Sequence, residues 1–210
     1  MSEAGDARFW NRAARNYAAR PVDDPAAYER TLDRTRALLR PGDRVIELGC
    51  GTGSTALSLA GAAGAYLATD ISPEMIAIAR EKHAAAPVAG LEFRVATAAS
   101  LAGEAGAANA VLAFNVLHLA RGAEAELRRI RDLLVEGGLF ISKTPCLGDM
   151  NPLIRLAVIP ALRAIGKAPF VRSFRAADLA GLIAAAGFDI LAEERHAERD
   201  GRPFIVARRR

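Results

Sequence analysis

Cysteine is scarce in this chain of 210 residues, and its two cysteines, Cys50 and Cys146, are far apart and form no C-x-x-C pair. This spacing argues against a disulfide framework and against a cysteine-based zinc site, so both thiols are expected to be reduced. Long apolar runs are also missing, since none approaches the roughly 20 residues of a membrane span. The first residues lack the basic-then-apolar order of a signal peptide. We therefore expect a cytoplasmic protein.

Aromatic residues are few as well, at 6% of the chain, although the net charge is +4 and the pI is about 9.5. Many of the basic residues are arginines near the two ends of the chain. Because few aromatics lie among them, an arginine-rich surface explains the charge better than a nucleic-acid interface does. Hydrophobic residues make up 51% of the chain, which suits one compact domain.

Short apolar runs alternate with stretches of helical period from residue 44 onward. The strand-like runs are 44–47, 65–70, 91–95, 110–114 and 139–144, and the helical stretches are 54–63, 72–85 and 124–134. Alternation of this kind indicates β-α-β units with right-handed crossovers. The sequence therefore predicts an α/β fold with a doubly wound, mostly parallel sheet.

Local signals fix two helix boundaries in this prediction. Ser72-Pro73-Glu74 is typical of a helix start, because the hydroxyl can cap free N–H groups and proline suits the first turn. Glu136-Gly137-Gly138 is interpreted as a helix stop before the strand at 139.

The two ends of the chain depart from this repeat. Residues 188–196 and 203–208 are strand-like and flank the turn Asp200-Gly201, which predicts an antiparallel hairpin and a total of seven strands. Residues 6–19 and 25–39 have the pattern of amphipathic helices. We divide the single domain, 1–210, into N-terminal helices (1–40), a cofactor-binding core (44–144), a lid-like insertion (146–174), and a C-terminal part (175–210) that contains the helix 176–185 and the hairpin.

A glycine-rich loop, Gly49-Cys50-Gly51-Thr52-Gly53, follows the first predicted strand and precedes a helix. Bare backbone at the carboxyl end of a parallel strand lets a ligand approach closely, so the loop is expected to face a ligand. Ser54 stands where the dinucleotide pattern G-x-G-x-x-G has its third glycine. Asp70 ends the next strand, where a carboxylate can accept hydrogen bonds from both ribose hydroxyls. These features favour a nucleoside ligand without requiring a pyrophosphate.

Three stretches, "VIELGCGTGS", "LATDISPEMIAIAR" and "LRRIRDLLVEGGLFISKT", resemble motifs of class I S-adenosylmethionine-dependent methyltransferases. The resemblance covers roughly residues 44–144 and is nearest to the small-molecule, ubiquinone/menaquinone-type branch. It implies a Rossmann-like methyltransferase fold, S-adenosyl-L-methionine as cofactor, and methyl transfer to a small acceptor. A quinone-like or lipid-like acceptor, apolar or amphiphilic, fits that branch.

The same resemblance implies a set of cofactor-binding residues. Gly49, Gly51 and Gly53 would underlie the methionyl and ribose parts, Cys50 lies in the same loop, Glu47 would brace it, Asp70 would bind the ribose, and Ile71 would lie against the adenine. The chain departs from the family where an acid often meets the adenine amino group, since it has Thr97 and Ala98 there. We expect backbone contacts near these two residues to take over that role.

The sequence gives fewer signals for residues that contact the methyl acceptor than for residues that bind the cofactor. Asn115 could hydrogen-bond cofactor or acceptor, and His118 could act as a general base, with a packing role for His118 as the alternative. No acidic metal cluster of the catechol-type enzymes is present, so no metal is expected. Trp10 and Tyr17, seven residues apart on the first helix, could cover the acceptor or simply anchor that helix.

The segment 146–174 is the most distinctive feature on the acceptor side. Its part 151–167 is apolar with spaced cations, which is typical of a lid over an apolar pocket or of a membrane-surface helix. Two other functions stay open at this point. One is a non-catalytic S-adenosylmethionine-binding protein, and the other is an NAD(P)-dependent oxidoreductase, which Ser54 disfavours. The oligomeric state does not follow from the sequence.

Overall fold

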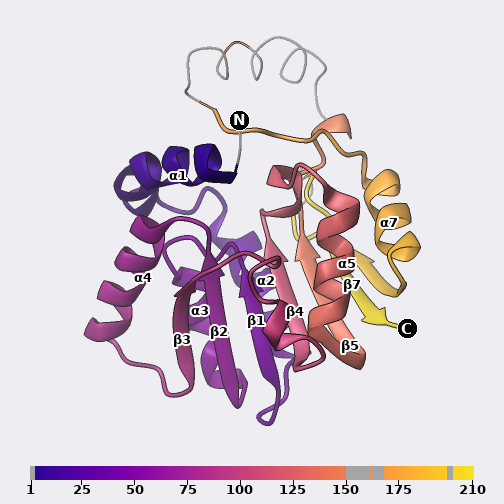
Figure 1. Ribbon diagram of the computed structural model, residues 1–210, viewed down its shortest axis with the longest axis horizontal. Coiled ribbons are helices and arrows are strands. Elements are labelled where there is room, and N and C mark those ends of the chain that lie inside the picture. The colour runs from indigo at the N-terminus through magenta and orange to yellow at the C-terminus, as the bar shows by residue number, and fades with distance from the viewer. Residues whose placement is uncertain (1–2, 150–160, 162–167, 198–200) are drawn as a thin grey trace.

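One seven-stranded sheet forms the centre of the molecule (Figure 1), whose computed structural model describes residues 3–149, 161, 168–197 and 201–210. The strands are β1 Arg44–Leu48, β2 Ala65–Asp70, β3 Leu91–Val95, β4 Ala108–Phe114, β5 Leu134–Lys143, β6 Phe188–Glu194 and β7 Phe204–Arg209. Their order is β3-β2-β1-β4-β5-β7-β6, with β1 to β5 parallel and β7 antiparallel to β5 and β6. The predicted fold and terminal antiparallel pair are confirmed.

Helices cover both faces of this sheet. They are α1 Glu3–Ala18, α2 Pro25–Arg36, α3 Ser54–Leu59, α4 Pro73–Ala85, α5 Ala123–Leu133 and α7 Ala176–Ala185, with short 3₁₀ turns at Ala60–Ala62, Ala102–Glu104, Leu117–Leu119 and Leu147–Asp149. Buried side chains of α5 and α7 pack on one face, and those of α2, α3 and α4 pack on the other. Helix α1 lies against α4.

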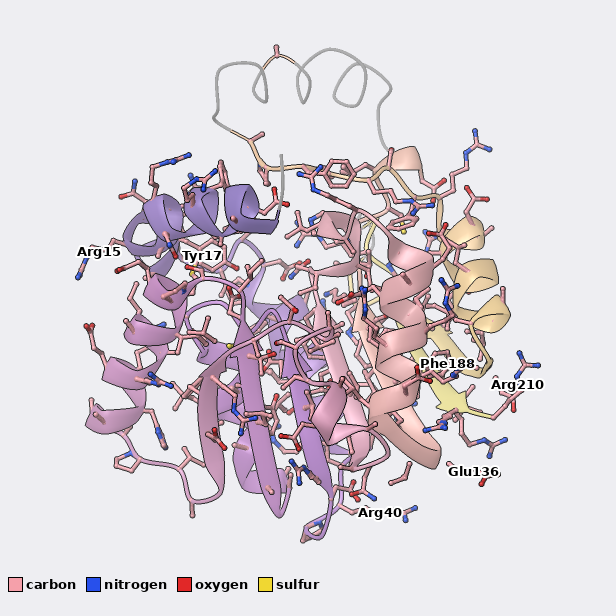
Figure 2. The ribbon with its side chains drawn as sticks, in the orientation of Figure 1. Arg15, Tyr17, Arg40, Glu136, Phe188 and Arg210 are labelled. Carbon is pink, nitrogen blue, oxygen red and sulfur yellow. The ribbon has the colours of Figure 1, made fainter. Side chains whose placement is uncertain are left out.

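Figure 2 distinguishes the two ends of the sheet. Figure 2 places Tyr17 at the end where the parallel strands finish, while Arg40 and Glu136 lie at the opposite end.

Two predicted features lie outside the described residues. They are most of the insertion, with its segment 151–167, and the turn residue Asp200. Within the described ranges, no helix is both long enough and apolar enough to cross a bilayer.

The predicted helix start at Ser72 is confirmed, because its Oγ accepts a hydrogen bond from the Met75 N–H at 3.2 Å. The predicted helix stop at Gly137-Gly138 is wrong. Helix α5 ends at Leu133, and β5 begins at once at Leu134. Gly137 instead has a φ of 74° inside β5, close to the register shift between β4 and β5. Glycine allows the left-handed backbone that such an irregular strand requires.

Gly53 ends the loop after β1 and precedes α3 with a φ of 78°. A Cβ placed there would lie 2.8 Å from Ala79 Cβ and 2.8 Å from the Phe93 ring. Gly53 therefore lets the start of α3 pack against α4 and β3.

We predict that Gly53→Ala lowers the free energy of unfolding by about 2–4 kcal/mol, because left-handed strain adds to overpacking. Gly106→Ala is the matched control. Its φ is 65°, and nothing lies within 4 Å of an added Cβ, so it carries strain alone. Urea denaturation of both variants makes the comparison, and equal losses would contradict the packing role of Gly53.

Glu47 is a carboxyl group buried inside the sheet layer, with 2% of its surface exposed. Its Oε2 accepts a hydrogen bond from the Tyr66 hydroxyl at 2.8 Å. Burial raises the pKa of Glu47 from 4.5 to about 7, although the Tyr66 hydrogen bond opposes the shift. The folded protein thus keeps a proton that the unfolded chain releases at lower pH.

We predict that Glu47 makes stability fall as the pH rises. Its contribution is fully present below the unfolded pKa of 4.5 and is lost as the pH passes the folded pKa of about 7. Glu47→Gln stays neutral, and its amide oxygen can still accept from Tyr66. Relative to the natural protein, this variant should gain about 2–3 kcal/mol between about pH 5 and about pH 8. Denaturant unfolding at both pH values tests this, and a constant difference would refute it.

Candidate active site

Two cavities open at the carboxyl ends of the parallel strands. The Asp70 cavity, of about 460 Å³, lies over the ends of β1, β2 and β4, and the Lys143 cavity, of about 660 Å³, lies between α2 and the sheet. Both volumes are within the usual range of small-molecule sites. Four residues line both cavities: Tyr17, Gly49, Phe114 and Asn115. We call these four residues the seam.

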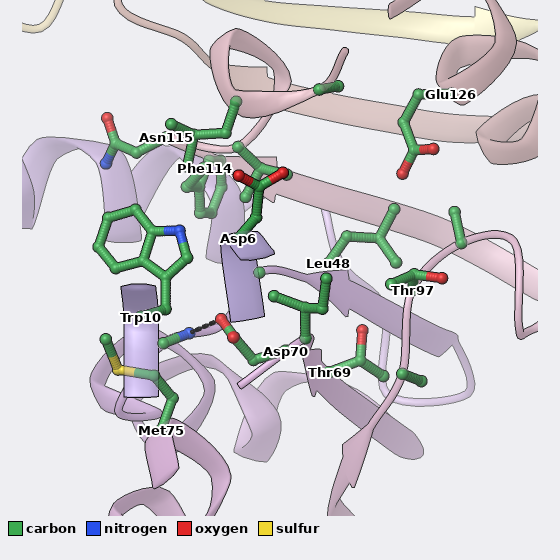
Figure 3. A pocket seen from close by; sticks show the side chains of 18 of the residues that line it. Asp6, Trp10, Leu48, Thr69, Asp70, Met75, Thr97, Phe114, Asn115 and Glu126 are labelled. Carbon is green, nitrogen blue, oxygen red and sulfur yellow. Dashed lines mark hydrogen bonds between the residues drawn. The ribbon is translucent and has the colours of Figure 1, made fainter. Parts of the chain in front are cut away.

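Asp70 joins the loop after β1 to the loop after β2 through hydrogen bonds. Its Oδ2 accepts a hydrogen bond from the Gly51 N–H at 3.0 Å (Figure 3, dashed line), and its Oδ1 accepts one from the Ser72 N–H at 2.8 Å. Burial raises the pKa of this carboxyl, while backbone hydrogen bonds from Ser72, Gly51 and Ile71 oppose the shift. Each carboxylate oxygen keeps a further lone pair, so Asp70 can still accept from a ligand.

Gly49 and Gly51 serve the Asp70 cavity in different ways. A Cβ on Gly49 would lie 2.2 Å from Val116 Cγ2, so this glycine lets the loop after β4 pack against the loop after β1. A Cβ on Gly51 would meet only Tyr17 Cε1, at 3.6 Å. Gly51 therefore keeps open space in the cavity, and its φ of 54° also suits glycine.

The predicted adenine-side residues, Ile71, Thr97 and Ala98, line the Asp70 cavity. The backbone N–H of Thr97 donates to Ser100 Oγ at 2.9 Å, and Ser100 Oγ donates to Thr97 O at 3.0 Å. This amide is therefore already used inside the turn after β3. The expected replacement of the missing acid by the Thr97 amide has to compete with Ser100.

Helix α1 contributes to the opposite wall of the Asp70 cavity, where Trp10 and Tyr17 meet edge to face with ring centroids 6.2 Å apart. Two residues that the sequence reasoning missed stand at the rim. Asp6 of α1 forms an ion pair with Arg121, at 3.0 Å, and both line the cavity (Figure 3 labels Asp6). Arg121 also stacks over Phe170 at 4.5 Å. Three distant parts of the chain thus meet at this rim.

Asn115 stands at the seam, where β4 ends. Its φ is 57°, a left-handed value that asparagine tolerates better than most residues do. Its N–H donates to Lys143 O at 2.7 Å, which fixes the backbone turn. Strained backbone of this kind is frequent at functional sites, and here it places an exposed amide side chain beside both cavities.

Other predicted site residues have different positions. Glu47 and Cys50 line the Lys143 cavity and not the Asp70 cavity, and Gly53 and His118 line neither. The His118 Nδ1 is buried without a hydrogen-bond partner among the described residues. Burial, with the nearby Arg202 charge, lowers the pKa of His118 to about 4. This histidine is neutral at neutral pH, and the structure does not bring it to either cavity.

Lys143 is a further residue that the sequence reasoning missed. It is the last residue of β5 and lines the larger cavity. A polar residue that ends an otherwise apolar parallel strand is the signal that identified Asp70 on β2, and the same signal was available at Lys143.

Cys146, three residues after Lys143, is fully buried, and burial raises the pKa of its thiol to about 12. It is therefore not an activated nucleophile.

Comparison with known proteins identifies the core of the chain. Residues 45–138 match the family model described as a methyltransferase domain. A ubiquinone biosynthesis O-methyltransferase of Methylocella silvestris is 33% identical over 140 residues, which are 66% of this chain and 54% of that protein. The chain spans about half the length of the curated relatives that it matches.

Solved structures agree on the fold. The magnesium protoporphyrin IX methyltransferase of Synechocystis PCC 6803, solved with bound S-adenosylmethionine, has a TM-score of 0.72 at 21% identity, over 99% of this chain and 97% of that chain. An S-adenosylmethionine-dependent methyltransferase of Mesorhizobium loti has a TM-score of 0.69 at 23% identity, over 89% and 99% of the two chains. Residues 45–138 thus match the methyltransferase-domain family, and the chain shares the fold of S-adenosylmethionine-dependent methyltransferases of known structure.

Proposed function

We propose that this protein is an enzyme that transfers a methyl group from S-adenosylmethionine to a small amphiphilic acceptor. The observation that carries the proposal is the pairing of Asp70 with Gly51 at one cavity. The pair offers a carboxylate for ribose hydroxyls beside bare backbone that leaves room for the ligand.

The residues of the Asp70 cavity fit the cofactor. Asp70 would accept from the ribose hydroxyls, Gly49 and Gly51 would lie under the ribose and methionyl parts, and Ile71 would lie against the adenine. A side chain at position 51 would enter the space that the ligand needs. When bound, S-adenosylmethionine supplies an electrophilic methyl group whose departure leaves a neutral thioether.

The protein's own contribution is to align the reactants and to exclude water. Trp10 and Leu119 give the Asp70 cavity apolar walls, which favour a desolvated reaction. Asn115 lines both cavities, so we assign the orientation of the acceptor to Asn115 and not to His118. No residue of the described ranges has to act as a strong base for this function. If the acceptor atom is a hydroxyl oxygen, its proton is released to water as the oxygen takes the methyl group and the neutral thioether leaves.

The relatives named ubiquinone biosynthesis O-methyltransferase favour a hydroxyl oxygen as the acceptor atom. A quinone-like or lipid-like body with a polar end remains our proposal for the acceptor. The NAD(P)-dependent alternative is disfavoured by Ser54 and by β7, which runs antiparallel between β5 and β6. A non-catalytic binding protein would keep the cofactor site and give no turnover.

We predict that Asp70→Ala weakens the binding of S-adenosylmethionine about 5-fold to 150-fold, because ribose hydroxyls lose their acceptor. Gly51→Ala should also weaken binding, because the methyl group enters the cavity. Gly106→Ala is the control, since it introduces the same left-handed strain at an exposed site far from the cavity. Calorimetric titration of all four proteins measures the affinities.

Two outcomes would contradict the proposed function. One is tight binding of NAD without binding of S-adenosylmethionine, which would indicate an oxidoreductase. The other is cofactor binding that yields no S-adenosylhomocysteine with any of a panel of hydroxylated aromatic acceptors. That result would favour the non-catalytic binding protein.

A further inference from the structure

Helix α4 contacts both of the loops on which the cofactor site depends. At its start, the cap residue Ser72 donates its N–H to Asp70 Oδ1 at 2.8 Å. In its last turn, Lys82 reaches the glycine loop, where its Nζ donates a hydrogen bond to Thr52 Oγ1 at 3.0 Å. One stiff helix thus contacts both sides of the hydrogen bond between Gly51 and Asp70.

Lys82 holds the two residues that flank Gly53. Besides Thr52, its Nζ donates to Ser54 Oγ at 3.1 Å, so one ammonium joins the two hydroxyls. Gly53 itself packs on Ala79, which lies one turn before Lys82 on the same side of α4. The end of the glycine loop is therefore fixed to α4 by packing at its centre and by hydrogen bonds on both sides.

The hydrogen bonds of Lys82 have a cost. The side chain is half-buried, and desolvation lowers the pKa of its ammonium. Thr52, one of its two partners, is buried with 5% of its surface exposed. Partial removal of a cation from water costs free energy, and bonds to neutral hydroxyls have to offset that cost before they add stability. The contact is better explained by the loop that it fixes.

The conformation that this loop has to keep is demanding. Gly51 has a left-handed φ of 54°, and its N–H donates to Asp70 Oδ2 at 3.0 Å. Glycine backbone has more freedom than that of any other residue, so an unrestrained loop would lose entropy when a ligand binds. Thr52 follows Gly51 directly, and holding its side chain limits the conformations open to the glycine. A loop ordered on folding binds its ligand more tightly, because less ordering is left for the binding step.

We propose that Lys82 is a positioning residue for the cofactor, and that it acts through Thr52 and Ser54 to hold the glycine loop in the shape that receives S-adenosylmethionine. This inference rests on the proposed function, because it assigns the cofactor to the Asp70 cavity. Lys82 lines neither cavity, so it acts on the ligand only through the loop. Removing its ammonium should weaken cofactor binding while the residues of the cavity wall stay the same.

The test measures the affinity of the whole chain for S-adenosylhomocysteine by calorimetric titration. Lys82→Met should weaken binding about threefold to tenfold. Lys82→Arg should keep most of the affinity, because a guanidinium can still donate to both hydroxyls. Arg80→Met is the matched control on the same helix. Arg80 Nη2 donates to Phe93 O at 2.7 Å, which ties α4 to β3 and not to the loop, so this variant should keep the natural affinity.

Thr52→Val makes a smaller change at the other end of the contact. It removes the hydroxyl that accepts from Lys82, and it should also weaken binding. Added to Lys82→Met, it should cause no further loss, because the contact is already absent. Urea denaturation of each variant measures its stability separately. If Lys82→Met does not fold, the comparison of Thr52→Val with Arg80→Met takes its place.

Equal affinities of the natural protein and Lys82→Met would overturn the inference. An equal loss in Arg80→Met would also overturn it, because the effect would then come from the packing of α4 in general. The same holds if the losses of Lys82→Met and Thr52→Val simply add. A natural protein that binds neither S-adenosylhomocysteine nor S-adenosylmethionine would refute the proposed function as well, whereas binding that Lys82→Met leaves intact would refute only the role of Lys82.

Discussion

The hydrogen bonds from the Gly51 and Ser72 N–H groups to Asp70 are the contacts on which the site depends. They join the loop after β1 to the loop after β2, and they turn a half-buried carboxylate toward the Asp70 cavity. Burial of this charge opposes folding, since it raises the pKa of Asp70. The backbone donors offset part of that penalty. The acid that we propose to bind the ribose is thus held in place by the same loops that it joins.

The regular parts of this fold follow from the sequence, because their signals are local. The strand 65–70, the helix after Ser72 and the terminal antiparallel pair could all be predicted from period, caps and turns. The glycines at 137 and 138 misled the prediction, since glycine marks a strand irregularity as readily as a helix end. Which of the two applies depends on the neighbouring strand β4, and no local pattern contains that information.

In the candidate site, too, some residues could be predicted from a local motif, whereas others depend on contacts with distant parts of the chain. Asp70 and Gly51 could be identified because they belong to a short motif with a fixed context. Gly53 belongs to the same motif, yet its missing side chain makes room for Phe93 and Ala79 and not for a ligand. The partners of Lys143 and of Arg121 come from segments far away in the sequence, so their roles emerge only from the folded chain.

Thr31 and His196 are 165 positions apart in the chain, yet they touch beside the Lys143 cavity. Contacts between such distant positions form late, because a long loop must close first. During synthesis, α2 leaves the ribosome long before β7 does and then has no hairpin to pack against. The Asp70 cavity uses mainly the first two thirds of the chain, whereas the Lys143 cavity is completed only when the last strands are released. A chain truncated before β7 would therefore keep the glycine loop while losing Phe204, the ring on which His196 packs.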